Sequence, residues 1–249
     1  KKKYLNFNNY IEILFFIVYN CYRKKEKKEN TKKESGVIMG GNILNYENLL
    51  NMINISSKEI EKQISEIKLS FFDIRNDLIE YKMHVPIFVY PFYNFIVREK
   101  RLPTQEEYWN EYINVNKEWF AKTSLSEDLI KALKARAYRT YPSLVRDIHF
   151  NKLASESGLF ESVIYNDKLD VEDGVDLLVL KNNKCFAVNL YTKTRRAIES
   201  RFKKAYRHKK LDDSITNVEF PVEFKGSVKC GNFFLYGIDD VKRLAEICN

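Results

Sequence analysis

The stretch that most constrains the fold is 174–196, with the sequence GVDLLVLKNNKCFAVNLYTKTRR. Two apolar runs of β-favouring residues, 175–180 and 185–191, flank Lys-Asn-Asn-Lys. Asparagine tolerates the positive φ that a two-residue turn demands, so the stretch predicts a tight β-hairpin. With the turn centred on the Asn-Asn pair, Asp176 falls directly across from Asn189, at the spacing of about 5 Å between cross-strand neighbours.

Positive charge is local in this chain, whose net charge is +8. Residues 1–38 hold ten Lys/Arg and four Glu, and residues 181–210 hold eleven Lys/Arg against Glu199 alone. Such a local excess of basic residues indicates a polyanionic partner better than the overall charge does.

Cysteine and histidine usage indicates the cellular setting. The four cysteines show no CxxC pairing, and the three histidines lie far apart without metal-ligand spacing. A reduced, cytoplasmic protein is therefore expected, with cysteines acting as small apolar residues and no zinc site built on histidine.

Residues 1–38 are interpreted as a leader outside the folded protein. Their apolar run, 11–22, contains Glu12 and Asn20 and is shorter than the roughly 20 residues that span a bilayer, so no stable membrane insertion is expected. The Lys-rich stretch that follows is typical of disorder. One hypothesis is that 1–38 is translated upstream sequence, because codons for 35–39 can contain a ribosome-binding GGAG before an ATG. The rival hypothesis is a membrane-surface anchor.

Residues 39–135 predict a mainly helical region. A long amphipathic pattern follows Ser56, with apolar residues every three or four positions up to Tyr81. The run 86–97 is apolar and fits either a buried helix or a strand. Thr104 opens a capping box and Ser126 caps another helix. This region is expected to be either a recognition domain or a dimerisation platform, and the second role implies a homodimer.

Residues 136–249 predict a mixed α/β (α+β) domain. Pro142 can occupy the first turn of a helix that ends at Gly158. The elements expected after it are a strand at 160–165, the hairpin, a basic helix at 194–210, strands at 218–224, 227–229 and 233–236, and a helix at 238–247.

This order of elements resembles the PD-(D/E)xK nuclease superfamily, the restriction-endonuclease-like fold. The resemblance implies a helix with an acidic residue, a strand, a hairpin with Asp on one strand and (D/E)xK on the next, and a further helix beside the sheet. In this sequence the helix acid is Glu156, or alternatively Asp147, and the hairpin acid is Asp176. Asn189 stands at the second acidic position and Tyr191 at the lysine position.

The activity that the resemblance implies is Mg²⁺-dependent phosphodiester cleavage, in restriction, repair or mobile-element processing. Glu156 and Asp176 would hold the metal, which polarises the phosphate and lowers the pKa of bound water. Asn189 would add a neutral oxygen. Lys193, on the same strand face by alternation, would be a displaced catalytic lysine. The competing placement is the literal ExK at 223–225, preceded by two aspartates at 212–213.

The basic stretch that follows the hairpin predicts a nucleic-acid interface, with DNA as the expected partner although the pattern does not separate DNA from RNA. Three arginines on preceding helices, at 136, 139 and 146, would extend this interface. The residues expected to contact backbone phosphates are Arg195, Arg196, Arg201, Lys203, Lys204 and Arg207.

Two other functions compete with the nuclease. One is a catalytically inactive nucleic-acid-binding or assembly protein of the same fold, and the other is a membrane-surface protein that uses residues 1–28.

Overall fold

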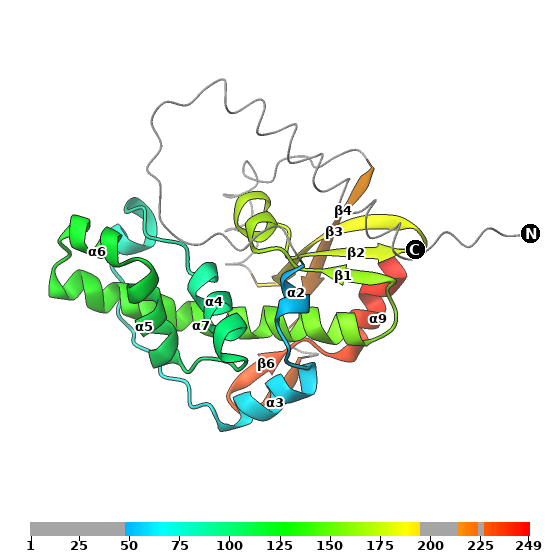
Figure 1. The fold of residues 1–249 in the computed structure, drawn as a ribbon, viewed down its shortest axis with the longest axis horizontal. Helices are drawn as coiled ribbons and strands as arrows, with labels where there is room; N and C mark the ends of the chain where they lie inside the picture. Colours follow the sequence, from blue (N-terminus) through cyan, green and yellow to red (C-terminus); the bar gives the residue numbers. More distant parts are fainter. Residues whose placement is uncertain (1–47, 195–213, 224–226) are drawn as a thin grey trace, which may run out of the picture. The chain divides into compact units, whose positions relative to one another are not determined.

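A computed structural model describes residues 48–194, 214–223 and 227–249, and shows a mixed four-stranded sheet combined with helices (Figure 1). The described helices are α2 (Leu49–Met52), α3 (Ser57–Glu66), η1 (Leu78–Lys82), α4 (Val89–Glu99), α5 (Gln105–Val115), α6 (Lys117–Thr123), α7 (Glu127–Glu156), η2 (Leu169–Asp173) and α9 (Ile238–Ile247). The described strands are β1 (Ser162–Ile164), β2 (Leu177–Lys181), β3 (Lys184–Thr192), β4 (Ile215–Val222), β5 (Val228–Cys230) and β6 (Phe233–Leu235).

The predicted hairpin is confirmed. β2 and β3 are antiparallel with Lys181 opposite Lys184, and Asn182 and Asn183 adopt φ values of 52° and 60°. The strand order is β1-β2-β3-β4, with β1 antiparallel to β2 and β4 parallel to β3. A parallel pair requires the chain to return to the opposite end of the sheet between β3 and β4. β4 is an outer strand of the described sheet, a position that tolerates its Pro221.

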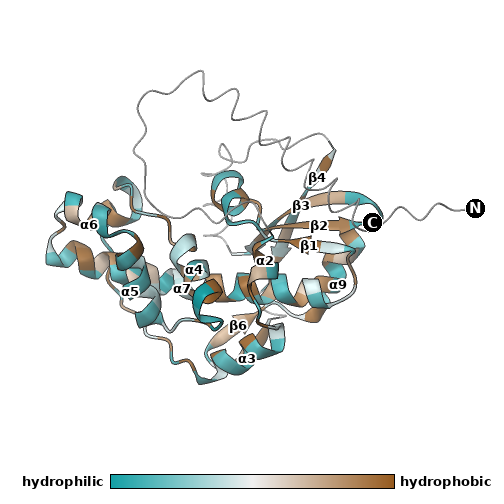
Figure 2. Cartoon of the chain, in the orientation of Figure 1, coloured by the Kyte–Doolittle hydropathy of each residue, from teal (hydrophilic) through white to brown (hydrophobic). Residues whose placement is uncertain are grey.

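One face of the sheet packs on α7, which runs beneath the strands in Figure 1. Alternate residues on neighbouring strands supply the core on this face, for example Leu177 on β2 opposite Val188 on β3. Phe150 on α7 stacks on Phe220 of β4, with 6.3 Å between ring centroids. Apolar residues mark the strands in Figure 2, whereas the outer faces of the helices are hydrophilic.

The helix α7 is a single 30-residue element, although the sequence predicts two helices separated near Pro142. Ser126 caps its start as predicted, accepting a hydrogen bond from the Leu129 N–H. Pro142 lacks the N–H that would bond the Tyr138 carbonyl one turn earlier. The Gln105 side chain donates to that carbonyl at 3.1 Å instead, so the helix continues through the proline. The predicted boundary at 135/136 therefore lies inside α7, within one compact unit.

The long amphipathic helix predicted after Ser56 is wrong beyond Glu66, where α3 ends. Phe71 and Tyr81 lie on its expected apolar stripe but are 61% and 75% exposed. After Glu66, side chains from other helices form hydrogen bonds with the backbone of this segment, in place of the hydrogen bonds within a helix. The Arg139 guanidinium, for example, donates to the Ile74 carbonyl at 2.8 Å. These long-range hydrogen bonds hold the segment in a non-helical path that the local pattern does not reveal.

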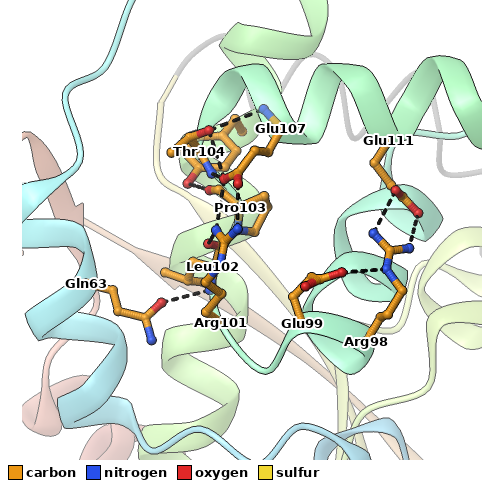
Figure 3. Close-up of polar contacts among 10 residues, drawn as sticks. Gln63, Arg98, Glu99, Arg101, Leu102, Pro103, Thr104, Glu107 and Glu111 are labelled. Atoms are coloured by element: carbon orange, nitrogen blue, oxygen red, sulfur yellow. Dashed lines mark hydrogen bonds and ion pairs between the residues drawn. The ribbon is translucent and has the colours of Figure 1, made fainter.

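Salt bridges and a cap join α4 to α5, as Figure 3 shows. The predicted capping box is confirmed, because the Thr104 hydroxyl accepts from the Glu107 N–H and the Glu107 carboxylate accepts from the Thr104 N–H. Arg101 pairs with the same Glu107, and Arg98 makes a two-pronged contact with Glu111 at 2.8 and 3.0 Å. The run 86–97, which fits helix or strand by sequence, forms most of α4.

Candidate active site

A β-bulge places Asp176 at the start of β2. The register pairs Leu177 with Val188, and the Asp176 N–H donates to the same Val188 carbonyl at 3.0 Å. Two consecutive residues therefore lie against one residue of β3, and such bulges redirect side chains. The Asp176 carboxylate accepts a hydrogen bond from the Leu190 N–H. The regular ladder ends at Leu177, so the expected pairing of Asp176 directly across from Asn189 is replaced by the bulge.

Asn189 turns toward β4. Its side chain is buried, and its Nδ2 donates to the Glu219 carboxylate at 3.1 Å. Glu219 is its register partner on the parallel strand. By strand alternation Asn189 also projects from the face opposite to Val188, which faces the core. The predicted second metal-site position is thus directed at β4.

Glu156 caps the start of α3. The Ser57 N–H and hydroxyl both donate to its carboxylate, the hydroxyl at 2.6 Å. Asp147 lies nine residues earlier on α7. Nine residues are about two and a half turns and about 13 Å, so the two side chains project from opposite sides of the helix. Only one of the two candidate helix acids can therefore face the hairpin.

Replacing Glu156 with Ala is expected to lower stability without affecting catalysis. The Ser57 N–H would lose its partner, and an unsatisfied buried donor costs about 1–3 kcal/mol. Urea denaturation of Glu156→Ala beside the exposed control Glu66→Ala measures this loss. Disappearance of metal-dependent cleavage in a folded Glu156→Ala variant would restore Glu156 to the site.

Lys193 forms an ion pair with Glu223 at 2.8 Å, with side chains 56% and 61% exposed. The hydrogen bond from Lys193 to this carboxylate raises the pKa of the lysine. Lys193, from the favoured placement of the catalytic site, is thus paired with Glu223, from the competing ExK placement. The other residues of the competing placement, at 212–213 and 225, lie outside the described residues.

The charges of three aspartates from three elements act on one buried tyrosine, Tyr93: Asp147 on α7, Asp170 on η2 and Asp176 on the bulge. Burial raises the pKa of Asp147 to about 7, while the charge of Arg146 lowers this pKa and the charge of Asp170 raises it. Burial raises the pKa of the Tyr93 hydroxyl well above 10, and the charges of all three carboxylates raise it further. Asp147 and Asp176 act in the same direction on Tyr236, whose pKa burial also raises.

Tyrosines line this acidic site, and sequence reasoning missed them. The Tyr165 hydroxyl donates to the Asp170 carboxylate at 2.8 Å, and the Tyr165 and Tyr93 ring centroids are 4.6 Å apart. Asp170 was also missed, although 167–176 holds five acidic residues immediately before the hairpin. That local density of carboxylates was the available signal. The tyrosines come from α4, the end of β1 and the end of β6, and no sequence pattern links them.

The donor chemistry of the acidic site suits Mg²⁺ with a small number of protein ligands. Within the described ranges, no group of three His, Cys, Asp or Glu side chains could hold a metal ion. Mg²⁺, however, is commonly bound through one or two carboxylates, with waters and substrate phosphate completing its shell. Burial raises the pKa of Asp147 even though the charge of the neighbouring Arg146 lowers it, so a bound cation would stabilise the carboxylate further.

The predicted nucleic-acid contacts lie mostly outside the described residues, including all six at 195–207. The three arginines proposed to extend the interface bind within the protein. Arg136 donates to the Ile79 carbonyl, Arg139 pairs with Glu80, and Arg146 donates to the Phe234 carbonyl at 2.8 Å. Among the helices of the described part, none is long and apolar enough to cross a membrane.

Comparisons of the chain with protein-family models, with curated proteins and with solved structures find no match.

Proposed function

We propose that this chain engages nucleic acid and cleaves phosphodiester bonds with the help of Mg²⁺, in a domain similar to the PD-(D/E)xK nucleases. The succession of α7, β1 and the β2–β3 hairpin supports the resemblance, as does the parallel return to β4. The observation that carries the proposal is that Asp147, on a long helix, and Asp176, on a bulged hairpin strand, both act electrostatically on the buried Tyr93 and Tyr236.

The proposed reaction would assign the following roles to residues of this chain. Asp147 and Asp176 would hold Mg²⁺, which when bound supplies a Lewis acid at the phosphate. The Leu190 N–H fixes the Asp176 carboxylate by donating to it. Tyr165 orients Asp170 beside the pair. The basic residues at 195–207 remain the proposed contacts to backbone phosphates, since their charge suits a polyanion.

Cleavage of labelled single- and double-stranded DNA and RNA by the purified chain tests this proposal. Mg²⁺ or Mn²⁺ should support cleavage and EDTA should abolish it. Asp176→Asn should slow cleavage by at least about 100-fold, because a metal contributes several kcal/mol to transition-state stabilisation. The exposed control Asp73→Asn should cleave at the wild-type rate. The proposal fails if no substrate is cleaved, or if Asp176→Asn remains fully active.

A catalytically inactive nucleic-acid-binding protein is the second candidate function. Two observations favour it: Asn189 brings no carboxylate, and the Lys193 ammonium is paired with Glu223. Binding without cleavage, with an affinity that falls steeply as salt rises, would identify this function. Filter binding of the same labelled substrates, repeated at about 50 to 200 mM salt, measures this affinity. Binding through phosphate contacts weakens strongly over that range.

A further inference from the structure

Asn151 is a buried polar residue of α7 whose amide oxygen has no hydrogen-bond partner in the structure described here. The residue is 1% exposed. Leaving a buried acceptor unsatisfied costs about 1–3 kcal/mol, and such groups are rare unless a water, an ion or a function explains them. The protein therefore bears a cost at Asn151 that packing alone does not explain.

The position of Asn151 relates it to the acidic site. It follows Asp147 by four residues on an unbroken helix, so the two side chains lie on the same face, one turn apart. Side chains in an α-helix lean toward its N-terminus, which inclines Asn151 toward Asp147. The charges of Arg146, the preceding residue on α7, and of Asp170 on η2 both act on Asp147.

The chemistry of these neighbours calls for a cation. A carboxylate and an amide oxygen are both acceptors, so they are stabilised together by a donor or a positive ion between them. Mg²⁺ and Mn²⁺ prefer such oxygen ligands over nitrogen or sulfur. We propose that the Asn151 amide oxygen is a further ligand of the divalent cation held by Asp147. This inference rests on the proposed function, but cation binding can be measured without any cleavage assay.

Titration of the full chain with Mn²⁺, followed by electron paramagnetic resonance of the free ion, tests the inference. Asn151→Leu keeps the approximate size of the side chain and removes its oxygen. Its Mn²⁺ affinity should fall by about tenfold or more, in the range found when groups that support a metal site are removed. The metal-free variant should melt at a higher temperature than wild type, because the unsatisfied acceptor is gone. A purely structural asparagine would leave the affinity unchanged.

Asn189 offers a matched comparison on β3. It is also buried, at 6% exposure, and its amide oxygen likewise has no partner in the described part of the chain. Its Nδ2, however, points to Glu219 on β4. Asn189→Leu should therefore leave the Mn²⁺ affinity at the wild-type value. An equal loss in both variants, or a loss in Asn189→Leu alone, would overturn the inference.

A second substitution protects the test against a folding failure of Asn151→Leu. Asn151→Asp retains an oxygen ligand and adds charge, so Mn²⁺ should bind at least as tightly as in wild type while the metal-free chain becomes less stable. Weaker Mn²⁺ binding by folded Asn151→Asp contradicts the inference. Mn²⁺ binding that depends on Asn151, without cleavage of any substrate, would uphold the site and refute the proposed nuclease. Absence of Mn²⁺ binding by wild type refutes both.

Discussion

Asp147→Asn is expected to stabilise the metal-free chain by up to about 4 kcal/mol at pH 8 while removing metal-dependent cleavage. Burial raises the pKa of this carboxyl from 3.8 to about 7 in the folded chain. One pKa unit corresponds to about 1.4 kcal/mol, and the shift is about three units. Asparagine is neutral at every pH and therefore avoids the cost of a buried charge.

The stability difference between Asp147→Asn and wild type should depend on pH in a definite direction. Below about pH 4 the carboxyl is protonated in both the folded and the unfolded chain, so it affects stability little. Between pH 4 and 7 the unfolded chain releases the proton first, and wild-type stability falls as pH rises. Above pH 7 the full penalty is present. The advantage of Asp147→Asn should therefore grow from near zero at pH 4 to its maximum above pH 7.

Urea denaturation in EDTA at a series of pH values measures the difference between Asp147→Asn and wild type. Asp73→Asn, at an exposed aspartate, is the matched control. Adding Mg²⁺ should stabilise wild type but not Asp147→Asn, because a cation that binds only the folded chain raises its stability. A pH-independent difference, or a less stable variant at pH 8, contradicts the assignment of Asp147 as a carboxylate whose pKa is raised by burial.

The sequence predicts the hairpin and most secondary structure because these features depend on neighbouring residues. The Asn182-Asn183 turn and the Thr104 capping box are examples in which each residue type has a local conformational reason. The prediction of Asp176 as a site residue likewise rests on its place before an apolar strand. The bulge beside it was not, because it depends on how β2 and β3 fit together rather than on any residue pattern.

The choice between Glu156 and Asp147 illustrates what local pattern cannot supply. Both lie on α7, but they project from opposite sides of it, and only the packing of that helix decides which side faces the sheet. The sequence suggests a break near Pro142, which leaves the phase of the helix after it undefined. Asp170 and its partner Tyr165 required the fold as well, since only the backbone path from β1 into η2 brings them together.

Gln105→Leu is expected to cost about 1–3 kcal/mol, because one buried side chain bonds three backbone groups and one of these, the Tyr138 carbonyl, is buried. Its carbonyl oxygen accepts from the Ser70 N–H at 2.7 Å, and its amide nitrogen donates to the carbonyls of Ser70 and Tyr138 at 3.0 and 3.1 Å. The buried Tyr138 carbonyl would be left without a partner at a cost of about 1–3 kcal/mol, whereas water can reach the exposed Ser70. Urea denaturation measures the loss, and a change below about 1 kcal/mol would show that water replaces these contacts.

A double-mutant cycle with Pro142→Ala isolates the role of Gln105 in keeping α7 continuous. Alanine at 142 restores an N–H that can bond the Tyr138 carbonyl within the helix. Gln105→Leu should then cost less by about 1 kcal/mol or more than it does beside Pro142. Equal costs in the two backgrounds would show that Gln105 acts only on Ser70. A positive coupling would mean that this glutamine holds together the two halves of the helix on which Asp147 and Asn151 lie, and so fixes their approach to the sheet.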